Sequence, residues 1–205
     1  MAYDWPYLVG GFGFAGSIGA AFLVRYVTIL VLTQSLAILF AGCSSNSARV
    51  IDMSDFLNVQ QERHQCGPNT LSIILRYWGV DKTPQEISSE IYNPALRGTL
   101  SLSMLLYAKL SGLDAFLYAG TISDLRKKIN DGYPVVLALA RQEPMVHFVV
   151  IYGYKGDKFI MYDGINSAVL IHQEEMQRLW KKAGNMILLV YPRGRHISIV
   201  PKEMR

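Results

Sequence analysis

The chain has 205 residues, of which 51% are hydrophobic, and a formal net charge of +4. This length accommodates one folded domain and an appendage. The charge surplus is mild and no basic cluster is interleaved with aromatic residues, so the sequence does not support nucleic-acid binding. Four histidines and two cysteines without ligand spacing do not support a metal site either, and no cofactor is expected.

The first 43 residues have the pattern of an export segment. Arg25 precedes a run without formal charge, residues 26–42, which ends in small residues before Cys43. A positive residue, an apolar region and small residues in this order are typical of a secretory signal peptide. Ala41-Gly42-Cys43 resembles a bacterial lipobox, which implies cleavage before Cys43 and lipidation of its thiol. An uncleaved transmembrane helix is the alternative.

Either alternative predicts a domain held at a membrane of the cell envelope, on the outer-membrane or periplasmic side. The Gly-rich residues 1–23 fit poorly before a signal peptide. They are either an over-extended start or a second short apolar helix. Residues 44–55 are expected to be a linker, residues 56–192 the folded domain, and residues 193–205 a tail.

The first half of the domain has the periodicity of helices. Thr83, Pro84 and Glu86 form a capping-box pattern at the start of the second helix. A short strand is expected between the third and fourth helices. The expected helices are 67–78, 84–92, 101–111 and 124–130, and the strand is 114–119.

The second half changes to the periodicity of strands. A helix over 173–183 precedes the last strand, and the strands 147–154 and 158–162 are expected to pair as a hairpin. Helices followed by an antiparallel sheet predict an α+β fold. The expected strands are 135–140, 147–154, 158–162, 168–171 and 186–191.

Cys66 stands between a polar stretch and an apolar helix. Pro68 is acceptable in the first helical turn, where its missing N–H has no partner to lose. The thiol is therefore expected at a helix N-terminus, where the macrodipole and free N–H groups favour a thiolate. A structural, buried cysteine is the alternative.

A cysteine nucleophile needs a base and a group that orients the base. His147 begins one strand of the predicted hairpin, and Asp163 ends the other. Pairing of the two strands would make His147 and Asp163 neighbours at one edge of the sheet. A carboxylate in this place can hold an imidazole in its working tautomer. Taken singly, His147 could be a strand-end histidine bonded to backbone, and Asp163 a turn residue before glycine.

The segments around these three residues resemble the C39-type, papain-like cysteine peptidases. The resemblance rests on Cys66-Gly67-Pro68 with an upstream glutamine, on His147-Phe148-Val149-Val150 and on Tyr162-Asp163-Gly164. It implies a papain-like fold with Cys66 as nucleophile, His147 as general base and acid, and Asp163 as orienter. Gln60, or Gln61 if the register slips by one, is implied as the donor to the oxyanion.

We therefore predict an exported, membrane-tethered cysteine peptidase that cleaves peptide or protein substrates, like the family's stand-alone lipoproteins. The best-known members cut after a double glycine, but Gln65 and Gly164 depart from their pattern, so this specificity is not carried over. Two alternatives remain. The same triad could serve an amidase or acyltransferase, or the domain could be catalytically silent and bind a peptide.

Overall fold

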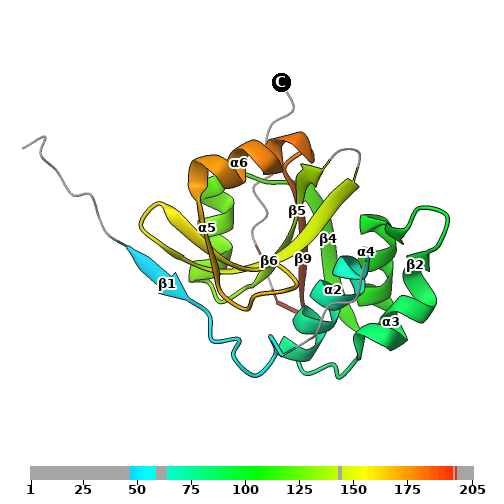
Figure 1. Cartoon of the computed structure of the whole chain (residues 1–205). Coiled ribbons are helices and arrows are strands. Elements are labelled where there is room, and N and C mark those ends of the chain that lie inside the picture. Colours follow the sequence, from blue (N-terminus) through cyan, green and yellow to red (C-terminus); the bar gives the residue numbers. More distant parts are fainter. Residues whose placement is uncertain (1–46, 59–63, 143–144, 196, 198–205) are drawn as a thin grey trace, which may run out of the picture. The chain divides into compact units, whose positions relative to one another are not determined.

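A seven-stranded antiparallel sheet forms the centre of the described part of the chain (Figure 1). The computed structural model describes residues 47–58, 64–142, 145–195 and 197. The strands follow the order β4-β9-β5-β6-β7-β8, and β1 pairs with β6 outside this path. Their bounds are β1 Ala48–Val50, β4 Leu113–Ala119, β5 Val135–Gln142, β6 Met145–Lys155, β7 Lys158–Tyr162, β8 Val169–His172 and β9 Met186–Pro192.

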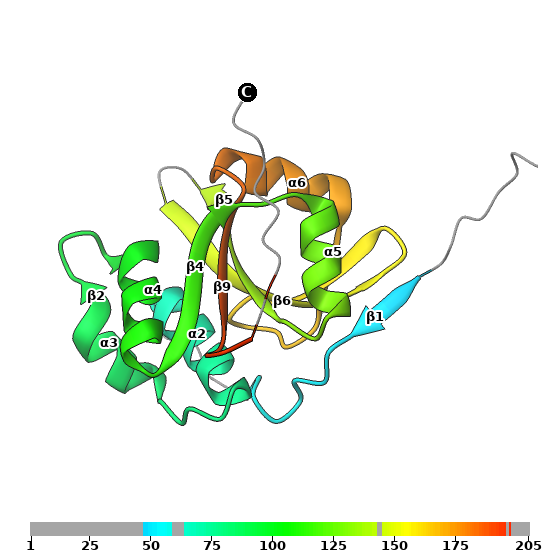
Figure 2. The ribbon, with the colours of Figure 1, turned by 180° about the vertical axis from the view of Figure 1, so that it is seen from behind.

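The described helices form two groups around this sheet. Figures 1 and 2 show α2, α3 and α4 together at one end of the molecule, and α5 and α6 at the other. A small two-stranded sheet of β2 (Tyr92–Asn93) and β3 (Gly98–Thr99) lies between α3 and α4 in sequence. The helices are α2 Cys66–Tyr77, α3 Pro84–Ile91, α4 Ser101–Leu110, α5 Ile122–Asn130 and α6 Gln173–Lys182.

The hydrophobic core packs α2 against the central strands β5 and β6. Every residue of α2 from Gly67 to Leu75 is buried, as expected for a helix that is apolar on several sides. Residues 135–139 and 149–151 of the two strands are fully or nearly fully buried, so both faces of the sheet are covered there, one of them by α2. The start of α2 is thereby held against β6.

The α+β fold class predicted from the sequence is confirmed. All the predicted helices and strands are present, and their ends agree within two residues. The capping box at the start of α3 is also present, since the Thr83 hydroxyl accepts from the backbone N–H of Glu86 and the Glu86 carboxylate accepts from Thr83. Thr121 caps α5 in a similar way through the N–H of Asp124.

Two features of the fold were not predicted. Within the predicted linker, β1 pairs with β6, and Ile51 and Met53 are buried. Gly153 permits this pairing, because a Cβ atom there would come within 3.0 Å of the Arg49 carbonyl oxygen. The short β2–β3 pair is the second feature.

The predicted export segment, including Cys43, lies outside the described residues. No helix within residues 47–58, 64–142 and 145–195 is long and apolar enough to cross a bilayer. The segment's role therefore stays a prediction.

Candidate active site

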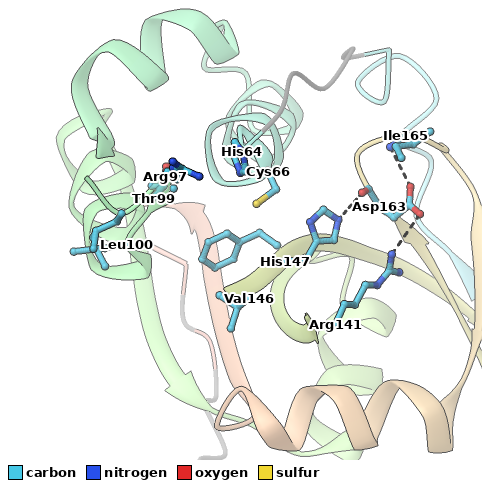
Figure 3. A pocket seen from close by; sticks show the side chains of 13 residues that line it. His64, Cys66, Arg97, Thr99, Leu100, Arg141, Val146, His147, Asp163 and Ile165 are labelled. Atoms are coloured by element: carbon cyan, nitrogen blue, oxygen red, sulfur yellow. Dashed lines mark hydrogen bonds and ion pairs between the residues drawn. The ribbon is translucent and has the colours of Figure 1, made fainter. Parts of the chain in front are cut away.

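A cleft of about 660 Å³ lies where the start of α2 meets β6 (Figure 3). Cys66 and His64 come from the helix side, and residues 96–100, which include β3, form a neighbouring wall. The opposite wall comes from the facing ends of β5 and β6 and from the turn after β7. Cys66, His147 and Asp163, which are far apart in sequence, all line this cleft.

Cys66 is the first residue of α2, as the sequence predicted for a helix N-terminus. The Thr70 hydroxyl donates to the carbonyl oxygens of Cys66 and Gly67, at 2.8 and 3.0 Å, and this fixes the first turn. Gly67 lets β3 approach closely, because a Cβ atom there would lie 2.8 Å from the Thr99 Cβ. A side chain at position 67 would therefore displace the wall beside the thiol.

The environment of the Cys66 sulfur combines burial with backbone donors. Burial raises the pKa of the Cys66 thiol above its ordinary value, and this outweighs the N–H groups of Phe148, Gly67 and Cys66 itself, which lower it. The Phe148 donor also shows that the sulfur lies against β6, beside His147. The expectation that the helix N-terminus yields a thiolate is thus opposed by the burial of the group.

His147 is held by a short hydrogen bond to backbone. Its Nε2 atom lies 2.6 Å from the carbonyl oxygen of Asp163. Because a carbonyl oxygen can only accept, Nε2 carries the proton in the neutral ring and Nδ1 keeps a free lone pair. In Figure 3 the Cys66 sulfur and Asp163 lie on opposite sides of the imidazole. The ring is therefore in the tautomer that leaves a basic nitrogen for the thiol.

The side-chain carboxylate of Asp163 has other partners. Its Oδ1 atom accepts from the backbone N–H groups of Ile165 and Asn166, at 3.0 and 2.9 Å. Its Oδ2 atom lies 3.9 Å from the Arg141 guanidinium. The carboxylate thus caps the turn after β7, and that turn presents the carbonyl to His147.

The protonation of His147 follows from the same surroundings. Burial lowers the pKa of the imidazole, and the charge of Arg141 acts in the same direction. The hydrogen bond to Asp163 raises the pKa of the imidazole, but by less than burial and Arg141 lower it. The raised thiol pKa and the lowered imidazole pKa both favour the neutral forms of the two groups in the resting protein.

Gln60 and Gln61, the predicted oxyanion donors, lie outside the described residues. The part of the chain that is described contains no group of three or more His, Cys, Asp or Glu side chains placed to hold a metal ion. Cys66 is a free cysteine.

The sequence interpretation missed two arginines that line the cleft. Arg141 stands at the end of β5 and Arg97 just before β3. Neither belongs to a motif, and only the pairing of the strands brings them near the thiol. Backbone strain marks one of these arginines: Arg97, with φ of 47°, and the cleft residue His64, with φ of 64°, are two of the three described non-glycine residues in the left-handed region.

This geometry defines a class of α+β protein in which a cysteine at a helix N-terminus lies beside a histidine on the facing strand. The model of the Peptidase C39 family matches residues 56–194, and the chain belongs to this family. No curated protein matches the chain significantly.

Solved structures of peptidase domains share the fold. The peptidase domain of Streptococcus ComA, a bi-functional ABC transporter, is 20% identical with a TM-score of 0.56, and the match covers 66% of this chain and 97% of that one. A C39-like peptidase from Bacillus anthracis is 18% identical with a TM-score of 0.57, covering 73% and 100%. A double glycine motif protease from an AMS/PCAT transporter, solved with its leader peptide, is 24% identical with a TM-score of 0.54, covering 72% and 93%.

Proposed function

We propose that this chain is an active cysteine peptidase that cleaves a peptide bond with Cys66 as nucleophile and His147 as general base. The hydrogen bond between His147 Nε2 and the Asp163 carbonyl carries the proposal, because it leaves Nδ1 free as a base in the cleft that Cys66 lines. Membership of the Peptidase C39 family supports this chemistry. The leader peptide bound to one structural relative supports a peptide as the ligand.

The reaction begins from a neutral thiol and a neutral imidazole. As the sulfur attacks the scissile carbonyl carbon, the thiol proton passes to Nδ1 of His147. The tetrahedral intermediate then collapses, the C–N bond breaks, and the same proton passes to the leaving amine. Water attacks the resulting thioester while His147 accepts its proton. The C–S bond breaks, the thiol of Cys66 is restored, and the acid product leaves.

The oxyanion needs donors that are already in place. The backbone N–H of Cys66 lies at the start of α2, where helical N–H groups have no intrahelical partner. Gln60, or Gln61, would supply a second donor from its side-chain amide. Replacing each glutamine with alanine separately distinguishes the two, since losing one oxyanion donor slows turnover by roughly a hundredfold or more.

The proposal is tested with a peptidyl probe that alkylates thiols. The wild type should be labelled much faster than a free cysteine, Cys66→Ala should not be labelled, and His147→Ala should be labelled slowly. Wild-type labelling no faster than that of a free thiol would refute the peptidase and favour a domain that only binds peptides.

We also propose that the domain is exported and tethered to the cell envelope through a lipid on Cys43. The Arg25, apolar and small-residue pattern supports this part of the proposal. Radioactive fatty acid should label the wild type but not Cys43→Ala. An unlabelled, uncleaved wild-type chain would instead indicate a transmembrane anchor.

A further inference from the structure

The walls of the cleft expose apolar side chains to a ligand. Leu96 and Leu100 are each 53% exposed on the wall beside β3, and Val146 and Ile165 are 40% and 86% exposed on the facing wall. Side chains of this size are exposed at a cost in free energy unless a partner covers them. A peptide that places apolar residues against both walls would cover them.

Charge in the cleft is unbalanced in favour of cations. Asp163 is the single carboxylate among the described residues that line it, and its oxygen atoms already face two backbone N–H groups and Arg141. Arg97 is exposed and forms no ion pair with any described residue. Figure 3 shows Arg97 beside Thr99 on the β3 wall, with Arg141 and Asp163 on the other side of the cleft.

The backbone of Arg97 adds a second observation. Its φ of 47° is a left-handed conformation, which is strained for a non-glycine residue. Glycine would adopt the same conformation without strain, and Gly98 is the next residue. Strained non-glycine residues cluster at active sites and ligand clamps, so this conformation supports a functional role for Arg97 in the cleft.

We propose that the cleft selects peptides carrying an aspartate or glutamate among apolar residues, and that Arg97 binds this carboxylate. The proposal rests on the proposed function for the peptide nature of the ligand. A guanidinium can pair with a carboxylate through two parallel N–H donors, which gives direction as well as charge. Arg97 is therefore a specificity-determining residue and takes no part in the chemical step.

Binding is measured on the full chain in detergent with Cys66→Ala, so that turnover is not required. The probes are pools of fluorescein-labelled octapeptides of Leu, Ile, Val, Ala and Gly, with one Glu or one Gln at each position in turn. At one position the Glu pool should bind roughly fivefold more tightly than the Gln pool, the size of an exposed ion pair of about 1 kcal/mol.

Adding Arg97→Gln should bring this ratio close to one, and Arg97→Glu should shift the preference to a Lys pool. The matched control is Arg178→Gln, which removes the same charge from an exposed position on α6 and should leave the ratio unchanged.

Equal binding of Glu and Gln pools, no binding of any pool, or a preference that survives Arg97→Gln would overturn the inference. Failure of this inference can be told apart from failure of the proposed function. A chain that binds the Glu pool through Arg97 but is not labelled by the thiol-directed probe would refute the peptidase and leave the acidic-peptide site standing.

Discussion

At the scale of single residues, the histidine is oriented by a main-chain atom. His147 contacts the carbonyl oxygen of Asp163, while the carboxylate of Asp163 holds the turn that follows β7. The side chain therefore acts on the imidazole mainly by positioning the backbone and by its charge. Substitutions at position 163 separate these contributions.

We expect Asp163→Asn to keep most of the probe-labelling rate, because an amide oxygen can still accept from Ile165 and Asn166. Asp163→Ala removes this cap, lets the carbonyl move, and should slow labelling by about tenfold or more. If the carboxylate oriented the imidazole directly, Asp163→Asn would itself lose on the order of 10⁴-fold in turnover. The labelling rates of the two variants decide between these readings.

The resting charge of the Cys66–His147 pair gives a second prediction. Since burial raises the pKa of the thiol and lowers that of the imidazole, the wild type should show no thiolate absorbance near 240 nm at pH 7 beyond that of Cys66→Ala. The difference should appear only as the pH rises above about 8.5, the ordinary thiol value. A difference present at pH 6 and abolished by His147→Ala would instead reveal an ion pair.

At the scale of elements, the site depends on the close approach of β3 to the start of α2. Gly67→Ala would place a Cβ atom 2.8 Å from the Thr99 Cβ, so one of the two backbones must shift. We expect the free energy of unfolding to fall by about 1 to 3 kcal/mol, with slower labelling of Cys66. Denaturant unfolding measures the first effect and the thiol probe the second.

Gly98→Ala is the matched control for this change. Gly98 also lines the cleft, but a Cβ atom there would approach nothing closer than the Leu96 carbonyl oxygen, at 3.8 Å. Its unfolding and labelling should therefore resemble those of the wild type. Equal effects at positions 67 and 98 would contradict the importance of the α2–β3 contact.

The elements themselves could be predicted because their signals are local. Thr83 marks the start of α3 by a side chain that caps a nearby N–H group, and the hairpin of β6 and β7 follows from alternation and a short turn. The leucines of α4 stand at helical spacing, but Leu102, Leu106 and Leu110 are exposed, and the buried side chains of the helix are Met104, Tyr107 and Ala108.

Contacts between residues far apart in the chain could not be predicted from these local signals. The burial that raises the thiol pKa depends on β6 packing against α2, and the hydrogen bond of His147 to a carbonyl instead of a carboxylate depends on the turn after β7. The pairing of β1 with β6 depends on a glycine in the middle of a strand. No spacing along the chain encodes these arrangements.

At the scale of the whole molecule, a buried polar cluster links α5 to β4 of the sheet, since the ion pair within α5 also accepts a hydrogen bond from a β4 tyrosine. Lys128 Nζ lies 2.7 Å from Asp124 Oδ1, both side chains are fully buried, and the Tyr118 hydroxyl of β4 donates to Asp124 Oδ2. Burial, together with the hydrogen bond to Asp124, raises the pKa of Tyr118 far above its ordinary value, so the phenol stays a donor. This cluster is remote from the cleft residues in sequence.

Asp124→Ala should lower the free energy of unfolding by about 3 to 5 kcal/mol, because it removes the carboxylate that both groups contact in a buried site. Lys127 is the neighbour of Lys128 in sequence and forms an exposed ion pair with Asp131. Lys127→Ala breaks this exposed pair and should change the free energy of unfolding far less. Thermal and denaturant unfolding compare the two variants. Similar losses for both would show that burial does not set the strength of these pairs.

The central claim, turnover through Cys66, is tested most directly by searching for new peptide N-termini. A peptide library made from a digested proteome is incubated with the full chain, and the products are identified by mass spectrometry. The wild type should produce cleavages that are absent with Cys66→Ala and strongly reduced with His147→Ala. The same products from the wild type and from Cys66→Ala, or none from either, would contradict a cysteine peptidase.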